Sequence, residues 1–186
     1  MPKNAYDAFD SAGRRKYLTP TEGKHFLKAA SRLPTRERLL CQTLYYVGCR
    51  VSEAVGLMGG DIDAAEGIVQ VLTLKKRQKH HVRRVPVPKR FARELVRLNS
   101  ANEPIWPISR MTAWRIVKAV MVEAQISGPQ ACCKGLRHGF AVRSVLAKIP
   151  IHLVQRWLGH SSITSTLIYL SIVGPEERNL IARTWV

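Results

Sequence analysis

The sequence of 186 residues predicts a mainly α-helical domain with a small antiparallel β-sheet, which is an α+β fold. Apolar residues recur at helical spacing along most of the chain. Proline, serine or threonine precedes several of these segments, as is typical of helix starts. One stretch, residues 67–87, instead has the β-branched composition of strands. No repeat or Gly/Ser linker divides the chain, so we expect one domain of residues 17–186 behind a basic, flexible arm of residues 1–16.

Helix-start signals define the first two helices. Residues 19–22 (Thr-Pro-Thr-Glu) form a capping box with proline at the first helical position. They predict a helix that carries Phe26, Leu27 and Ala30. A second helix is predicted from Pro34, because the apolar residues of the segment 39–47 share one face.

A β-hairpin is predicted next. Residues 67–74 and 82–87 are rich in valine, leucine and isoleucine and flank a polar turn. The region is also strongly basic, since residues 75–97 contain ten lysines and arginines and one acid, Glu94. A solvated basic face is one interpretation of this run. Such charge density repels itself unless an anion neutralises it, which favours contact with phosphates.

Helical spacing returns after the hairpin and continues toward the carboxyl end. A proline, a serine or a glycine marks most of the expected boundaries. The helices are predicted from Pro88, from Ser109 (carrying Trp114, Val117 and Met121), over 136–148, over 151–158 with a stop at Gly159, and from Gly174.

Composition excludes several classes of protein. The formal net charge is +17, and no apolar run is long enough to span a bilayer or to serve as a secretory signal. The charge therefore points to a polyanion, with nucleic acid ahead of anionic lipid. The four cysteines lack the spacing of a zinc site, so we expect no metal and interpret them as buried small apolar residues of a cytoplasmic protein.

Four polar features interrupt apolar helical segments. Arg50 follows a glycine at the end of a helix, a basic cluster occupies residues 134–138, and His160 follows Gly159. Tyr169 lies nine residues after that histidine. Each has an ordinary structural alternative, such as an ion pair, a helix cap or a core aromatic ring. Together they supply what phosphoryl transfer by a tyrosine nucleophile requires, namely guanidinium groups for phosphate, an imidazole and a phenol.

The order and spacing of these motifs resemble the tyrosine recombinase family, which includes phage integrases such as lambda integrase and Xer recombinases. The signatures fall on five parts of this sequence: residues 48–53 (Gly-Cys-Arg-Val-Ser-Glu), the hairpin tip 75–81, residues 134–137, residues 158–160 (Leu-Gly-His) and Tyr169. The resemblance covers about residues 17–183 and corresponds to the catalytic domain of the family, without its separate amino-terminal domain.

The resemblance implies DNA strand cleavage and rejoining without a cofactor. Tyr169 would attack a backbone phosphate and form a 3′-phosphotyrosyl link, while Arg50 and Arg137 would clamp that phosphate and His160 would support it. A hairpin lysine would protonate the leaving 5′-oxygen, and Glu53 would orient Arg50. The implied partners are double-stranded DNA and further copies of the chain, as dimers or tetramers on DNA, with no small-molecule substrate. The implied location is the nucleoid of a bacterium, with the gene bacterial or carried by a mobile element.

Two positions depart from the family pattern or leave it open. Lys134 stands where the family has histidine, so it is assigned to phosphate binding. His138 is adjacent to Arg137, but one residue turns a helix by about 100°, so it is not expected to replace that histidine. Adjacent strand residues face opposite ways, so only one of Lys75 and Lys76 can reach the phosphate, and Lys76 is preferred.

The rest of the basic hairpin is expected to contact DNA. The residues assigned to this role are Arg77, Lys79, Arg83 and Arg84. Three alternatives remain open at this point: a DNA-binding relic of a recombinase without catalysis, a type IB topoisomerase-like activity, and, more weakly, an RNA-binding protein. Aromatic residues make up only 7% of the chain, which disfavours the last of these.

Overall fold

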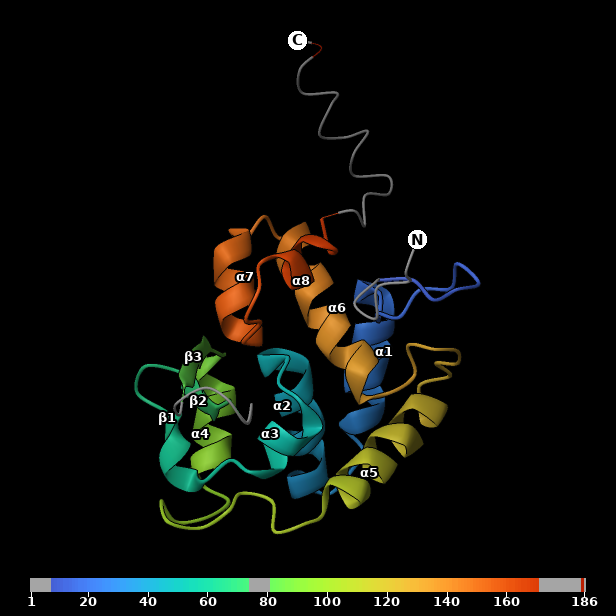
Figure 1. The fold of residues 1–186 in the computed structure, drawn as a ribbon. Coiled ribbons are helices and arrows are strands. Elements are labelled where there is room, and N and C mark those ends of the chain that lie inside the picture. Colours follow the sequence, from blue (N-terminus) through green and yellow to red (C-terminus); the bar gives the residue numbers. More distant parts are fainter. Residues whose placement is uncertain (1–7, 74–80, 171–184, 186) are drawn as a thin grey trace.

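The computed structural model describes residues 8–73, 81–170 and 185. Helices make up most of the fold, and a small sheet lies at one side of them, as predicted (Figure 1). Helices α1, α2, α5 and α6 pack together, and the sheet is flanked by α4. Helix α7 packs against α6 and strand β3, and α8 packs against α7.

The first two helices begin at the predicted residues. Helix α1 spans Pro20–Ala30, and both hydrogen bonds of its capping box are present, from Glu22 N to Thr19 Oγ1 (3.2 Å) and from Thr19 N to Glu22 Oε2 (2.9 Å). Helix α2 spans Thr35–Val47. It ends at Gly48, whose φ of 62° lies in the left-handed region that glycine adopts most easily.

The predicted hairpin is confirmed, and a third strand joins it. Strand β1 is Ile62–Asp63, after the 3₁₀ turn Gly59–Asp61, and β2 and β3 are Ile68–Leu72 and Val82–Pro86. The antiparallel order is β1-β2-β3, with Val69 opposite Val85. The strand β1 was not predicted, because two residues are too few to show a period of two.

Among the remaining helices, α4, α5 and α7 begin where the sequence predicted. Their bounds are α3 Val51–Val55, α4 Lys89–Val96, α5 Arg110–Glu123, α6 Cys133–Leu146, α7 Ile151–Leu158 and α8 Thr164–Leu167. Helix α6 begins earlier than the predicted Leu136, and the short helices α3 and α8 were not predicted. Helix α5 carries Trp114, Val117 and Met121 as predicted, with Trp114 43% exposed and the other two buried. The helix predicted from Gly174 lies outside the described residues.

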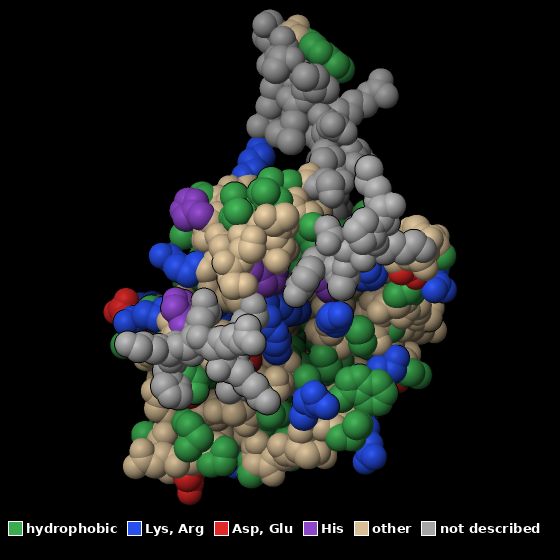
Figure 2. All heavy atoms as spheres, in the orientation of Figure 1, with side chains coloured by type: hydrophobic (Ala, Val, Ile, Leu, Met, Phe, Trp, Pro, Cys, Tyr) green, Lys and Arg blue, Asp and Glu red, His purple; other side chains and the backbone are tan. Residues whose placement is uncertain are grey.

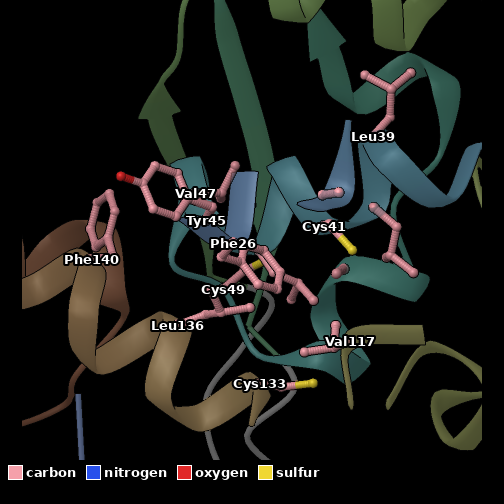
Figure 3. Close-up of a cluster of buried hydrophobic side chains, with 14 of the residues drawn as sticks. Phe26, Leu39, Cys41, Tyr45, Val47, Cys49, Val117, Cys133, Leu136 and Phe140 are labelled. Carbon is pink, nitrogen blue, oxygen red and sulfur yellow. The ribbon is translucent and has the colours of Figure 1, made fainter. Parts of the chain in front are cut away.

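The core lies where α1, α5 and α6 meet around α2 (Figure 3). Phe26 and Leu136 are fully buried there. At the end of α2 the packing is tight, because a Cβ on Gly48 would lie 2.5 Å from the ring of Phe140. This close approach sets α6 against the end of α2, and α6 carries the basic cluster 134–138.

Cysteines pack among these core side chains. Cys41, Cys49 and Cys133 are buried, as predicted, whereas Cys132 is only partly so. No helix among the described residues is both long enough and apolar enough to cross a membrane.

The segment before α1 differs from the predicted flexible arm over residues 8–16. Ala8 is fully buried, and Lys16 N donates to Ala8 O at 2.8 Å. A β-bridge joins Phe9 to Arg15, and Arg15 pairs with Glu22 of α1 at 2.6 Å. These contacts dock the segment onto α1. Residues 1–7 lie outside the described part of the chain.

Candidate active site

Arg50 is held by a buried carboxylate. It lies between Gly48 and α3, and its side chain is 39% exposed. Glu53 accepts from Arg50 N (2.8 Å) through Oε2 and from Arg50 Nη1 (2.9 Å) through Oε1. The Gly48 turn and the α3 capping geometry therefore fix where the guanidinium points.

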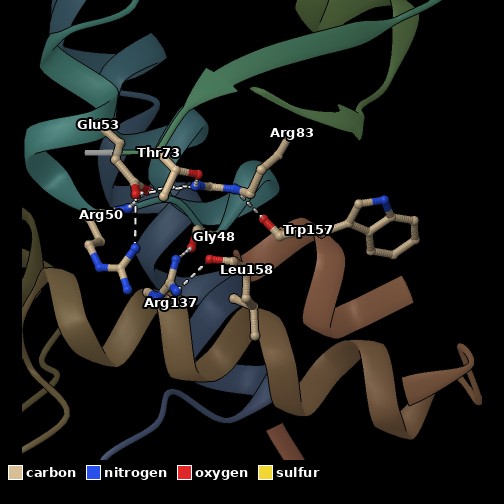
Figure 4. A network of polar contacts seen from close by, with 8 residues as sticks. All are labelled: Gly48, Arg50, Glu53, Thr73, Arg83, Arg137, Trp157 and Leu158. Carbon is tan, nitrogen blue, oxygen red and sulfur yellow. Dashed lines mark hydrogen bonds and ion pairs between the residues drawn. The ribbon is translucent and has the colours of Figure 1, made fainter. Parts of the chain in front are cut away.

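Arg83 completes this network from the sheet (Figure 4). Its Nη2 donates to Glu53 Oε2 at 2.8 Å, its Nη1 to Thr73 Oγ1 at 2.8 Å, and its Nε to Trp157 O at 3.0 Å. Burial alone would raise the pKa of Glu53, but the hydrogen bonds and charge of Arg83, with help from Arg50, hold that pKa below its ordinary value. Glu53 is therefore a buried carboxylate anion that bridges two arginines.

The assignment of Arg83 to DNA contact was wrong. Its side chain is 0% exposed, and the paired Glu53 side chain is 1% exposed. The position falls inside the basic run, but β3 directs this side chain inward, whereas its neighbour Arg84 faces solvent. Arg84 approaches Asp63 only to 4.0 Å. Arg83 is thus a structural residue that joins the hairpin to α3 and to the end of α7.

Arg137 is buried on α6 and is held by two backbone carbonyls. Its Nη1 donates to Gly48 O at 2.9 Å and its Nη2 to Leu158 O at 2.6 Å. These oxygens belong to the ends of α2 and α7, where the helix dipole favours a cation. Burial, followed by the charge of Arg50, lowers the pKa of Arg137 to about 10, so the group stays cationic at neutral pH. Figure 4 shows the guanidinium groups of Arg50 and Arg137 side by side.

Two histidines and Tyr169 come from α6 and from the segments on either side of α8. His160 Nδ1 lies 2.9 Å from Thr166 Oγ1, and Tyr169 Oη lies 2.7 Å from Nδ1 of His138. Tyr169 is 2% exposed. Burial raises the pKa of Tyr169 to about 12, an effect that the charge of Arg137 partly offsets. Tyr169 therefore lies within electrostatic reach of a guanidinium group.

The imidazole of His138 is uncharged at neutral pH. Burial, then the charges of Lys134, Arg137 and Lys16, lower its pKa to about 4. His138 and Thr166 were not predicted as site residues. The contact of His138 with Tyr169 depends on how the segment after α7 crosses α6, which local periodicity does not contain.

The other predicted site residues divide into two groups. Lys134 is exposed on the first turn of α6, and its charge helps to lower the pKa of His138. Lys75, Lys76, Arg77 and Lys79 lie outside the described residues.

On the face in Figure 2, lysine, arginine and histidine side chains gather in the middle, in a hollow between the sheet and the α7–α8 end. A pocket of about 300 Å³ lies beside His160 and is lined in part by His81, His152 and Arg156.

This arrangement suits an anionic substrate. Two arginines, one of them partly exposed, and neighbouring histidines can bind phosphate oxygens, and a phenol lies next to them. Among the described residues, no group of three or more His, Cys, Asp or Glu side chains could hold a metal ion.

Comparison with known proteins matches this chain to a protein family. Residues 16–173 match the family model described as the phage integrase family. The chain is 30% identical over 163 residues to the tyrosine recombinase XerD of Corynebacterium glutamicum, covering 81% of this chain and 53% of that protein. It is 28% identical over 181 residues to XerA of Pyrococcus furiosus, covering 90% and 61%. The chain therefore spans little more than half the length of these relatives.

Solved structures show the same fold. The crystal structure of XerA recombinase matches with a TM-score of 0.75 at 24% identity, over 90% of this chain and 64% of that one. The catalytic domain of bacteriophage HP1 integrase matches with a TM-score of 0.67 at 18% identity, over 89% and 93%. A pre-cleavage complex of the XerH site-specific recombinase with its difH substrate matches with a TM-score of 0.67 at 19% identity, over 96% and 60%.

Proposed function

Because the chain belongs to the phage integrase family, we propose that it is a site-specific recombinase that cleaves and rejoins DNA through a 3′-phosphotyrosyl intermediate. One observation supports the proposal. Arg137 of α6 donates to Gly48 O, two residues before Arg50, and to Leu158 O, two residues before His160, and its charge acts on the Tyr169 phenol. Long-range contacts hold this grouping together, so it is not a by-product of sequence proximity.

In the proposed reaction the two arginines bind the non-bridging oxygens of the scissile phosphate. Both are held in place before DNA arrives, Arg50 by Glu53 and Arg137 by two carbonyls. Such preorganised donors stabilise the charge that grows as the phosphorus becomes pentacoordinate. His160 and Lys134 donate to the same phosphate. Tyr169 forms the bond to phosphorus, and the 5′-oxygen leaves, so bond energy is retained in the phosphotyrosyl link.

We further propose that DNA binds along the basic hairpin and that copies of the chain assemble on it as dimers or tetramers. The net charge of +17 supports the first part, because phosphate contacts with counterion release drive binding of such proteins to DNA. Arg84 faces solvent from β3, consistent with a phosphate contact. Arg77 and Lys79 are proposed to share this role. The proposed site of action is bacterial nucleoid DNA.

A nicked suicide duplex tests the catalytic proposal. Cleavage beside the nick releases a short fragment that diffuses away, so the covalent intermediate accumulates. We expect a protein–DNA adduct that resists denaturation and forms without metal or ATP. If folded protein binds the duplex and forms no adduct, the chain is a DNA-binding protein without catalysis. The burial of Tyr169 is the observation that favours this alternative. Relaxation of supercoiled DNA that lacks a recombination site would favour a topoisomerase activity.

A hairpin lysine is the proposed general acid, and Lys76→Ala should slow cleavage by about 10²-fold or more. The ammonium protonates the 5′-oxygen as it leaves, so a 5′-thiol leaving group, which needs no proton, should restore the rate. Single-turnover cleavage of oxygen and sulfur substrates measures this. Lys75→Ala is the matched control, and rescue of Lys75→Ala in place of Lys76→Ala would reverse the assignment.

A further inference from the structure

A short contact joins the proposed nucleophile to a histidine that the family motifs do not use. Tyr169 Oη lies 2.7 Å from His138 Nδ1, and the two ring centroids are 5.7 Å apart at an interplanar angle of 57°. His138 is on α6, directly after Arg137, whereas Tyr169 follows α8. The contact therefore spans 31 residues and is made by tertiary packing.

We propose that His138 is the base that takes the proton of Tyr169 when its oxygen attacks DNA. This step rests on the function proposed above. The O–H bond of Tyr169 breaks and an N–H bond forms at Nδ1 of His138. The phenol oxygen bonds to phosphorus, and the P–O5′ bond breaks with its electron pair on the 5′-oxygen. That oxygen takes a proton from the hairpin lysine or from water.

His138 is in the protonation state that this role requires. Its neutral imidazole faces cations from two elements, Lys134 and Arg137 on α6 and Lys16 from the segment before α1, and the phenol faces it from the end of α8. In the tautomer with hydrogen on Nε2, the Nδ1 lone pair points at the phenol hydroxyl and accepts its hydrogen bond.

Neighbouring groups are less suited to the task. Lys134, which replaces the histidine of the family motif, is an exposed side chain that serves as a cationic donor rather than a base. His160 directs its Nδ1 to Thr166 Oγ1 at 2.9 Å. The Tyr169 hydroxyl instead lies 2.7 Å from Nδ1 of His138, within hydrogen-bonding distance.

Bound DNA would make His138 a stronger base. The charges of Lys134 and Arg137 contribute to the low pKa of the free protein. Burial is the larger cause of the low pKa and persists in the complex. A phosphate anion bound at these cations offsets their charge, so the pKa of His138 rises above its value in the free protein when substrate is present. The proton acceptor would then be weak in the free protein and effective in the complex, where a matched pKa favours general base catalysis.

Adduct formation on the suicide duplex, followed against pH, tests the assignment. At about pH 7, His138→Gln should form adduct about 10²-fold more slowly than the unaltered chain, because general base catalysis contributes at least that factor. The rate deficit of His138→Gln should shrink by about tenfold for each unit of increasing pH, because hydroxide then replaces the missing base. Added imidazole should accelerate His138→Ala. His25→Gln, which alters an exposed histidine on α1, is the matched control and should change nothing.

The outcomes separate the two proposals. If the unaltered chain forms adduct and His138→Gln matches or exceeds its rate, His138 is not the base and only this inference fails. An equal deficit at every pH, with no response to imidazole, shows a purely structural role and also overturns it. If the unaltered chain itself forms no adduct, the proposed function fails.

Nitrogen-15 NMR of the unaltered chain gives a test that needs no variant. The inference requires His138 to carry its hydrogen on Nε2, and its pKa, about 4 in the free protein, to rise when duplex DNA binds. A hydrogen on Nδ1, donated to Tyr169, would refute the assignment even if the variants failed to fold. An unchanged pKa in the complex would refute it equally.

Discussion

Tyr169→Phe should bind the DNA duplex as the unaltered chain does and form no covalent adduct with it. The substitution removes the oxygen proposed to attack the phosphate and leaves Arg50 and Arg137 in place, so phosphate binding should persist while the adduct falls below detection. It also leaves His138 Nδ1 without its buried partner, which should lower the free energy of unfolding by about 1–3 kcal/mol. Denaturing electrophoresis of labelled duplex, a mobility shift and chemical denaturation measure the three effects.

Tyr46→Phe is the matched control for this change. Tyr46 is a half-buried residue of α2 whose ring packs against Phe91, so removing its hydroxyl should leave adduct formation intact. An adduct that survives in Tyr169→Phe would place the nucleophile at another residue. Mass spectrometry of the digested adduct would then identify that residue.

Arg83→Met should destabilise the protein by about 3 kcal/mol or more. Methionine fills part of the volume but leaves the Glu53 carboxylate buried with only Arg50 beside it, and uncompensated buried charge is costly. Arg84→Met, one residue along the same strand and exposed, should change the free energy of unfolding by no more than about 0.5 kcal/mol. Denaturant unfolding followed by circular dichroism compares them. Equal effects of the two substitutions would contradict the network.

The pH dependence identifies the cause of this loss. The folded-state pKa of Glu53 is lowered, so its ionisation stabilises the fold above the ordinary carboxyl pKa and ceases to do so as pH falls through the lowered value. The deficit of Arg83→Met should therefore be largest near neutral pH and shrink in acid, where Glu53 is protonated. Adding Glu53→Gln to Arg83→Met should recover part of the loss, because no buried anion then remains.

Local signals predicted the helices well. The capping box before α1, the serine before α5 and the stop at Gly159 each act through neighbouring backbone groups. A few consecutive residues are therefore enough to predict these helix ends. The motifs of the candidate site could be identified for another reason, since their spacing resembles that of a known family. Strand β1 and helices α3 and α8 were not predicted, because elements of 2, 5 and 4 residues are too short to show a hydrophobic period.

Long-range pairings account for the errors at the site. Arg83 belongs by sequence to a basic surface run, and only the position of Glu53, 30 residues away, shows why it is buried. His138 was set aside by counting rotation along its own helix. That count says nothing of Tyr169, which reaches it from a different element. Periodicity describes one element at a time, whereas these contacts join two.

The carbonyl oxygens that hold Arg137 carry partial charges only. A carboxylate in their place would have cancelled the cation, whereas two helix ends orient it and leave its full charge to attract an anion. The free protein therefore keeps an enclosed cation near Arg50 at an energetic cost, visible in its lowered pKa. Binding of a phosphodiester removes part of that cost, so occupancy and folding are thermodynamically linked. Resistance to unfolding should thus be greatest when the chain is on DNA.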